Sequence, residues 1–407
     1  MGRNSKTIVG IDIGTNKVSA VVGEIDSDGL SVIGVSSQPS YGVKKGIIIN
    51  MDSTVDSIKN AVEEVETMAG IDIHSTVVGI SGSHITGFNS NGVIPLSNKE
   101  VRKNDIAAAM EAAKALVIPM DREVIHILPQ EFIVDDQDGI KDPLGMSGVR
   151  LESRVYIITS AVASAQNIIR CINRSGLKVQ DLILSQLASS ESVLTEDEKE
   201  LGCALIDIGG GTTDISIFNK GSIRHCAVLP IGGGHITSDI AIGIRTPISE
   251  AEEIKKDFGQ AFRSAENPAE TLDFVNIGER ETRKISKNTI AQIVKARVEE
   301  TFSLIHKELL SAGLMEFLPA GVVLTGGTAL LNGISEVAKK KLGLPVRIGS
   351  PQEINGINDV RNPEYATGAG LILFAARGYM NDFYTNNMRN NIWKVGGKMK
   401  QWFAEAF

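Results

Sequence analysis

The chain has 407 residues, of which 42% are hydrophobic, and its formal net charge at pH 7 is −8. That length exceeds what one compact core holds and suits two lobes with subdomains. The negative charge argues against nonspecific binding to nucleic acid, so no nucleic-acid partner is expected. Three cysteines without metal-ligand spacing indicate buried thiols in a reducing compartment.

Two acidic, glycine-containing turns repeat along the chain. Residues 12–17 (DIGTNK) and 207–214 (DIGGGTTD) each follow a β-branched apolar run and precede another. Glycine in such a turn lets backbone N–H groups point at phosphate oxygens, and an aspartate at the strand end offers the hard oxygen that Mg²⁺ prefers. Ordinary hairpins also carry Asp and Gly, but turn chemistry does not require the same Asp-Ile-Gly twice. The repeat therefore favours one nucleotide and its metal ion bound between two related halves.

A third glycine-rich segment, TGGT at 325–328, follows the apolar strand 322–324 and precedes a helix. Backbone can approach a flat or anionic ligand closely at such a place. Asp12 and Asp207 are the expected Mg²⁺ ligands. The nucleotide contacts expected from the three segments are Gly14, Thr15, Asn16, Lys17, Gly209, Gly210, Gly211, Thr212, Thr213, Gly326, Gly327 and Thr328. Neither a Walker-type loop nor Gly-x-Gly-x-x-Gly is present, which excludes a P-loop or dinucleotide-binding fold.

In their order along the chain, these segments resemble the actin, Hsp70 and sugar-kinase superfamily, in which ATP lies between two hairpin-bearing halves. The resemblance adds one connecting helix around Gln186 and a second at 368–370 (GAG). It implies an α/β fold of two ribonuclease H-like lobes, with ATP and Mg²⁺ as cofactors. It also implies that Gln186 orients an attacking water beside Asp12 and Asp207. A helix-end hydrogen bond remains the alternative role for Gln186.

Two inserts are expected to interrupt the lobes. The first has a core pattern of its own, with a turn at 89–92, a helix at 104–116 and strands at 124–128 and 132–134. The full division is residues 1–82 and 157–198 for the first lobe (1A), 83–156 for its inserted subdomain (1C), 199–229 and 308–378 for the second lobe (2A), 230–307 for the second insert (2B), 379–391 for a linker and 392–407 for a terminal helix.

The second insert begins with PIGGGHITSDI at 230–240 and continues with a helix near Ser249. Ser249 and Glu252 have the spacing of a capping box. Within the superfamily, Ala-Glu-x-x-Lys at this place contacts the nucleotide, which implies binding roles for Glu252 and Lys255 and leaves the capping role of Glu252 open. Gly233 and Gly234 are expected to contact the cofactor as well.

The last residues, 391–407 (NIWKVGGKMKQWFAEAF), follow an asparagine-rich stretch and contain both tryptophans. Wound as a helix, they place apolar side chains on one face and lysines opposite, as an interfacial membrane helix does; a helix docked on the protein is the alternative. Attachment by a single tail should be weak, so many tails on one polymer would be needed. The expected membrane-facing residues are Ile392, Trp393, Val395, Met399, Trp402, Phe403 and Phe407.

The nucleotide segments, both inserts and the tail together resemble the FtsA family of bacterial cell-division proteins, with His235 as a departure from a commoner acidic or amide residue. The resemblance implies an actin-like polymer at the cytoplasmic face of the cell membrane, at the division septum. There it would tether FtsZ, support Z-ring assembly and recruit later division proteins, with slow or negligible ATP hydrolysis. Two alternatives remain: a pilus-assembly relative that shares the insert, and a small-molecule kinase, for which no sugar pocket can be located.

The family's Arg-x-x-Glu pattern falls on Arg297 and Glu300. One helical turn would place both charges on one exposed face, where the acidic C-terminal peptide of FtsZ could bind. The alternative is a solvated pair within the helix.

Overall fold

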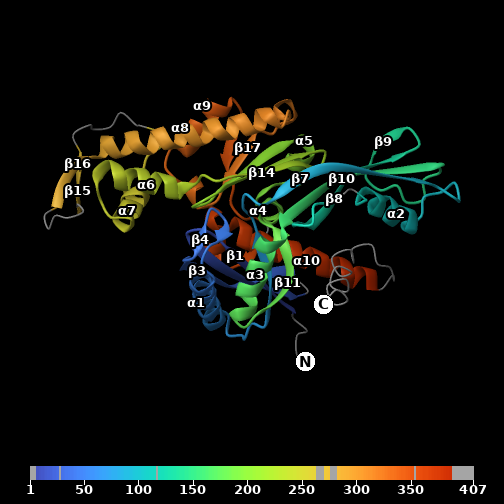
Figure 1. The fold of residues 1–407 in the computed structure, drawn as a ribbon, viewed down its shortest axis with the longest axis horizontal. Coiled ribbons are helices and arrows are strands. Elements are labelled where there is room, and N and C mark those ends of the chain that lie inside the picture. Colours follow the sequence, from blue (N-terminus) through green and yellow to red (C-terminus); the bar gives the residue numbers. More distant parts are fainter. Residues whose placement is uncertain are drawn as a thin grey trace.

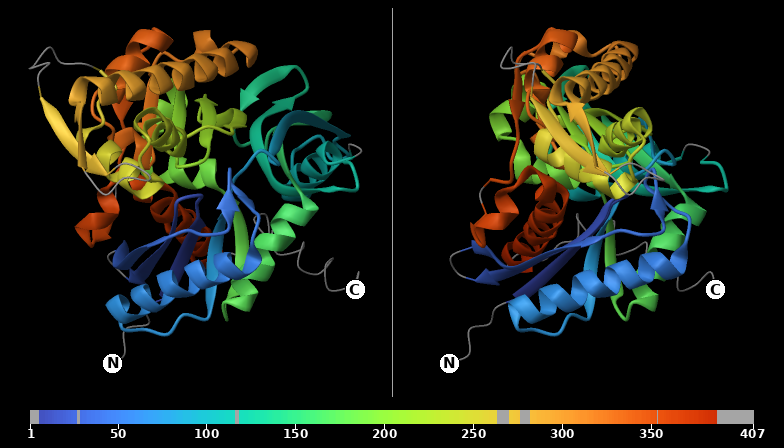
Figure 2. Two further views of the ribbon diagram at one scale, coloured as in Figure 1. Left: turned by 60° about the vertical axis from the view of Figure 1, so that its left-hand side comes forward. Right: turned by 90° about the vertical axis from the view of Figure 1, so that its left-hand side faces the viewer.

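The computed structural model describes residues 6–26, 29–115, 118–262, 270–275, 282–352 and 354–386, so the expected terminal helix at 392–407 lies outside the described residues. Two lobes face each other, with α1 in one lobe and α8 in the other (Figures 1 and 2). No helix of the described part is long and apolar enough to cross a membrane.

The first lobe is built on a six-stranded sheet in the order β11-β6-β1-β2-β3-β19. β1 and β2 each carry a continuous buried run and form the predicted antiparallel hairpin, and β1 pairs in parallel with β6. Helices α1 (Met51–Ala69) and α3 (Val162–Arg174) cover one face. The strands are β1 (Lys6–Ile13), β2 (Lys17–Asp26), β3 (Gly29–Pro39), β6 (Ser75–Ile80), β11 (Lys178–Leu184) and β19 (Asn355–Gly356), with the small hairpin β4 (Val43–Lys44) and β5 (Ile47–Ile48) beside them.

The second lobe repeats this arrangement with the sheet order β14-β13-β12-β17-β18. Its antiparallel hairpin, β12 and β13, pairs in parallel with β17 just as the first hairpin pairs with β6. The repeat of sequence is therefore a repeat of structure. Helices α6, α8 and α9 (Ile334–Leu342) pack on one face. The strands are β12 (Cys203–Ile208), β13 (Thr213–Asn219), β14 (Ser222–Leu229), β17 (Val322–Thr325) and β18 (Val346–Ile348).

Two helices connect the lobes, as expected: α4 (Ser185–Val193) and α10 (Ala366–Asn386). They cross at Gly370, where a β-carbon would lie 1.7 Å from the Ala188 carbonyl oxygen. Because α10 runs to Asn386, residues 379–386 of the predicted linker are helical. Polar composition suggested a linker, but this stretch has no proline or glycine to stop a helix that is already formed.

The inserted subdomain contains α2 (Lys103–Ala113) and the sheet β7-β10-β8-β9. It packs against the second lobe: the Gln130 Nε2 donates to the Ile223 carbonyl oxygen at 2.9 Å, and the Ser222 hydroxyl donates to the Gln130 carbonyl oxygen at 3.2 Å. The subdomain is thus inserted in the first lobe but also contacts the second. Its strands are β7 (Thr86–Pro95), β8 (Arg122–Val134), β9 (Gln137–Ile140) and β10 (Arg150–Ala161).

One predicted turn in this subdomain is wrong, because residues 89–92 lie within β7. Gly92 has another purpose there: a β-carbon on it would lie 2.0 Å from the Ala109 carbonyl oxygen of α2. Its glycine therefore lets the helix approach the sheet closely. The two predicted strands 124–128 and 132–134 are one continuous strand, β8.

The second insert consists of α6 (Gly233–Ile244), α7 (Ile248–Phe258), the hairpin β15 (Thr271–Val275) and β16 (Thr282–Ser286), and the start of α8 (Lys287–Ser311). The predicted capping box is wrong, because α7 begins at Ile248 with Pro247 as its N-cap and Ser249 lies inside the first turn. Proline before the first turn sets the helical start instead. The short helix α5 (Glu196–Leu201) precedes β12.

Candidate functional site

The turns of the two hairpins have the same backbone geometry and face each other. In the first turn the Gly14 amide donates to the Lys17 carbonyl oxygen, and in the second the Gly209 amide donates to the Thr212 carbonyl oxygen, both at 2.9 Å. A β-carbon on Gly210 would lie 2.4 Å from the Asn16 Cγ, and one on Gly211 would lie 2.5 Å from the Thr15 Oγ1. Glycine therefore lets the two turns approach each other closely where the lobes meet.

Three carboxyl groups gather behind these turns: Asp12 at the end of β1, and Asp207 and Asp214, which face each other across the β12–β13 pair. Burial raises the pKa of all three, and the charge of Asp12 contributes to the rise at Asp207. The pKa of Asp207 is raised to about 7 and that of Asp214 to about 8. A cluster of buried carboxyls lacking enough positive charge nearby suits a cation.

The two connecting helices each bring one side chain to this cluster. The Thr367 hydroxyl of α10 donates to Asp207 Oδ2 at 3.2 Å. Gln186, in the first turn of α4, donates from Nε2 to Asp214 Oδ1 at 2.9 Å, and its Oε1 is buried without a hydrogen-bond partner among the described residues. The same Asp214 oxygen accepts a 2.5 Å hydrogen bond from the Ser81 hydroxyl.

The Lys17 side chain contacts Glu364 and Tyr365, just before α10. Its Nζ donates to the Glu364 carbonyl oxygen at 2.7 Å, lies 3.1 Å from the Glu364 carboxylate and stands 4.3 Å above the centre of the Tyr365 ring. Lys17 therefore has a charge partner of its own, and its contact with a phosphate stays a prediction.

The third glycine-rich segment lies against the second hairpin. Gly326 has a φ of +86°, a backbone conformation that favours glycine, and a β-carbon on it would lie 2.3 Å from Asp207 Oδ1. The Thr328 hydroxyl donates to the Gly209 carbonyl oxygen at 3.0 Å. The predicted loop at 325–328 is thereby fixed to the predicted loop at 207–214.

Glu252 and Lys255 meet beside the start of α6. The Lys255 Nζ lies 2.7 Å from Glu252 Oε2 and 3.4 Å from the Gly233 carbonyl oxygen, and the Thr237 hydroxyl donates to Glu252 Oε2 at 2.5 Å. The Gly233 amide donates to the Gly209 carbonyl oxygen at 2.9 Å. The structure thus brings the predicted residues of 2B next to the second phosphate turn.

His235 is the third residue of α6, at a position where an acidic or amide residue was expected. Its Nδ1 accepts a hydrogen bond from the Gly232 amide at 3.1 Å, which is the reciprocal bond that an acidic residue makes three positions after a cap. The departure therefore keeps the local geometry of the α6 start.

The donor set fits a hydrated divalent cation bound together with a phosphate. Among the described residues, no group of three or more His, Cys, Asp or Glu side chains could hold a metal on its own. Mg²⁺ needs only one or two carboxylates in a nucleotide site, since phosphate and water provide the other ligands. Asp12 and Asp207 are of that kind, and their assignment as ligands stays a prediction.

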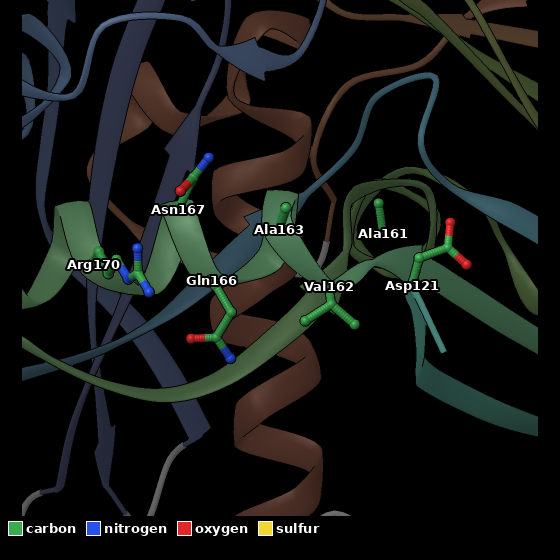
Figure 3. Close-up of a pocket in the computed structure, with 7 residues that line it drawn as sticks. All are labelled: Asp121, Ala161, Val162, Ala163, Gln166, Asn167 and Arg170. Atoms are coloured by element: carbon green, nitrogen blue, oxygen red, sulfur yellow. The ribbon is translucent and has the colours of Figure 1, made fainter. Parts of the chain in front are cut away.

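A surface groove of about 560 Å³ lies away from both hairpins. It runs along the first turns of α3 beside Asp121, and Gln166 and Arg170 are among the residues that line it (Figure 3). No residue of the turns at 12–17 and 207–214 lines it, so the groove is separate from the candidate nucleotide site.

Arg297 and Glu300 lie on α8 as predicted, but Arg297 has ion-pair partners within the chain. Its guanidinium forms two hydrogen bonds to Asp239 of α6, at 2.5 and 2.9 Å, and a third to Glu300 at 2.5 Å. The Arg297 side chain is 24% exposed and that of Glu300 56%. The expectation of two exposed charges holds for Glu300 alone, because Asp239 holds Arg297 against α6.

The fold and the paired hairpins define the class of protein as an actin-like ATPase fold. Solved structures with this fold include the PilM–PilN type IV pilus biogenesis complex, with a TM-score of 0.65 at 15% identity, covering 91% of this chain and 98% of that one. MreB5 of Spiroplasma citri bound to ADP has a TM-score of 0.56 at 16% identity, covering 92% of this chain and 99% of that one.

Sequence relatives are far more similar than these structures. A cell division protein FtsA of Pseudomonas aeruginosa is 49% identical over 91% of this chain and 90% of its own, and one of Neisseria meningitidis is 42% identical over the whole of both chains. The family model for cell division protein FtsA matches residues 204–370, and the model for the SHS2 domain inserted in FtsA matches 82–159. The chain belongs to the FtsA family of cell division proteins.

Sequence reasoning missed three residues of the site. Asp214 was recognised only as the end of a motif, although its register opposite Asp207 in a hairpin places both carboxyls together. Thr367 could have been found as the residue before the GAG segment of the second connecting helix. Ser81 follows an ordinary strand and gave no signal.

Proposed function

We propose that this member of the FtsA family is an ATP-dependent switch that polymerises on the cell membrane and tethers FtsZ to it. One observation supports the nucleotide site above all: the carboxyls of both hairpins meet at the lobe junction next to Gln186 and Thr367, residues of the two connecting helices. A ligand held there would lie next to both connecting helices.

Backbone amides of the two turns at 14–17 and 209–213, other than those of Gly14 and Gly209, which donate within the turns, would bind the phosphates. Asp12 and Asp207 would hold the magnesium ion. That ion, when bound, would supply positive charge to phosphate oxygens. The carboxyl groups themselves would then be ionised at neutral pH, because a nearby cation opposes the rise in their pKa that burial causes. Gly326, Gly327 and Thr328 would contact the adenosine from 2A, and Gly233, Gly234, Glu252 and Lys255 from 2B.

Hydrolysis would depend on Gln186. Its Nε2 is committed to Asp214, which leaves the buried Oε1 as an acceptor that can orient an attacking water. Slow hydrolysis suits a switch, because the closed arrangement of the lobes then persists long enough to favour the polymer.

The remaining parts of the function rest on family membership and on sequence. The tail at 392–407 would lie on membrane phospholipid, and attachment would gain strength when many tails act together on one polymer. The C-terminal peptide of FtsZ would bind 2B near Arg297 and Glu300. Location at the septum and recruitment of later division proteins would follow from that contact.

Asp207→Asn tests the nucleotide site, because the amide keeps an acceptor for the Thr367 hydroxyl but removes the charge. We expect the affinity for ATP with Mg²⁺, measured by calorimetry, to fall roughly tenfold or more. Asp56→Asn, an exposed change on α1, is the matched control and should bind ATP as the wild type does. Equal affinities for the Asp207 variant and the control would reject the site.

A further inference from the structure

Ser81 connects the two lobes directly at the proposed site of hydrolysis. It follows the last residue of β6 in the first lobe, and its hydroxyl donates to Asp214 Oδ1 in β13 of the second lobe at 2.5 Å. The residue after it, Gly82, has a φ of +139° and is buried. The chain turns sharply here, at the residue where the match to the inserted domain begins.

The Asp214 oxygen that Ser81 contacts is the one that holds Gln186. Its two donors, the Ser81 hydroxyl and Gln186 Nε2, lie 2.5 and 2.9 Å away. A carboxylate oxygen has two lone-pair positions, so these two donors fill it and fix the rotation of the carboxyl group. When a cation bound at the site keeps Asp214 ionised, its oriented oxygen in turn fixes the amide of Gln186, since the reverse orientation would bring two oxygens together.

The fixed amide leaves Gln186 Oε1 as a buried acceptor that makes no hydrogen bond with the described residues. A buried acceptor without a partner is costly, and native proteins keep one mainly where a ligand or water uses it. Ser81 therefore acts on Gln186 Oε1, the acceptor that the hydrolysis of ATP would use. It does so through Asp214 and not by direct contact.

A second contact ties Ser81 to the first phosphate turn. The Gly46 amide donates to Thr15 Oγ1 at 3.3 Å, and Gly46 packs so closely on this loop that a β-carbon would lie 3.1 Å from the Ser81 carbonyl oxygen. Gly46 thus links the turn at 12–17 to the backbone of Ser81, whose hydroxyl contacts Asp214.

We infer that Ser81 is a positioning residue of the nucleotide site, which holds Asp214 from across the lobe junction and through it orients Gln186 toward the attacking water. This inference rests on the proposed function. It also gives the inserted subdomain a route to the site, because that subdomain begins at the residue after Ser81.

The test compares Ser81→Ala and Ser81→Thr with the wild-type full chain, and Ser83→Ala, at an exposed serine two positions on, is the matched control. ATP affinity is measured by calorimetry with Mg²⁺, and phosphate release by single turnover of bound radiolabelled ATP. Ser81→Ala should slow phosphate release about tenfold, the effect of losing one hydrogen bond to a charged group. Its ATP affinity and melting temperature should stay close to those of the wild type.

Threonine keeps the hydroxyl, so Ser81→Thr should restore most of the rate, whereas a purely structural serine would show equal rates in all variants. Equal rates for Ser81→Ala and Ser83→Ala would overturn the inference. So would a wild-type protein that binds ATP and releases no phosphate, since Gln186 would then orient no water; nucleotide binding would stand. A wild type that fails to bind ATP would overturn both proposals.

Discussion

Gly370 of α10 touches Ala188 of α4 so closely that a β-carbon at Gly370 would lie 1.7 Å from the Ala188 carbonyl oxygen. This contact is the crossing point of the two helices that join the lobes. α10 also packs on β1, where a β-carbon on Gly10 would lie 2.9 Å from Leu371 Cβ. The relative position of the lobes therefore depends on the glycines Gly10 and Gly370 at these two contacts.

Gly370→Ala should destabilise the protein strongly. Backbone cannot give way as a flexible side chain does, so the two helices must separate, at a cost of about 3 kcal/mol or more. Chemical denaturation measures the free energy of unfolding. Gly327→Ala is the control, because a β-carbon there meets only Glu364 Cβ at 3.8 Å. Equal stability of the two variants would mean that the helices do not cross in this way.

Without nucleotide, the stability of the protein should fall as pH rises from 6 to 8. The pKa values of Asp207 and Asp214 in the folded protein are raised to about 7 and about 8, whereas in the unfolded chain both groups are already ionised at pH 6. The folded state then binds more protons than the unfolded state, so the free energy of unfolding decreases by up to about 1.4 kcal/mol per pH unit for each proton.

Urea denaturation at several pH values measures this slope. Asp214→Asn removes one of the titrating groups and should make the slope shallower. A stability that does not fall with pH in this range would show that the carboxyl groups are already ionised in the folded protein.

The ion pair between Arg297 and Asp239 allows the stability and the partner-binding roles of Arg297 to be separated. Arg297→Glu should abolish binding of the FtsZ C-terminal peptide, but it also places two carboxylates together at a cost of about 1 kcal/mol. The charge swap Arg297→Asp with Asp239→Arg should recover the stability. If the peptide needs a cation at position 297, fluorescence anisotropy will show no binding by the swapped protein; binding restored by the swap would place the peptide contact elsewhere.

Trp402→Glu with Phe403→Lys should abolish sedimentation with liposomes and leave ATP binding unchanged. Both residues are at the centre of the apolar face of the expected tail helix, where a charge opposes insertion between headgroups. Gln401→Glu with Glu405→Lys is the control, because it introduces the same two residue types, Glu and Lys, on the polar face. This variant should still sediment with liposomes. A tail docked on the protein would instead lower the melting temperature of the first variant without changing its sedimentation.

Periodicity predicted most elements because buried strands and helices leave regular patterns. Both hairpins, α1 and α8 were predicted in this way. Contacts between distant segments leave no such pattern. Gly92 suggested a turn, but in the structure it makes room for α2. The contact between Ser81 and Asp214 forms only when the two lobes come together in the folded chain.

The residues of the candidate site show the same difference between local patterns and contacts of distant segments. The repeated Asp-Ile-Gly identified Asp12 and Asp207 because a local turn carries its own chemistry. The internal partners of Arg297 and Lys17 were not foreseen, since Asp239 and Glu364 come from other elements and either charge could equally have faced solvent.

A calorimetric titration of the wild-type full chain with ATP, first with Mg²⁺ and then with the metal chelated, tests the proposed nucleotide site most directly. We expect one nucleotide per chain and an affinity that falls when Mg²⁺ is removed, because Asp12 and Asp207 then face the phosphates without a cation between them. Absence of binding with Mg²⁺, or an affinity that chelation leaves unchanged, would contradict the proposed site.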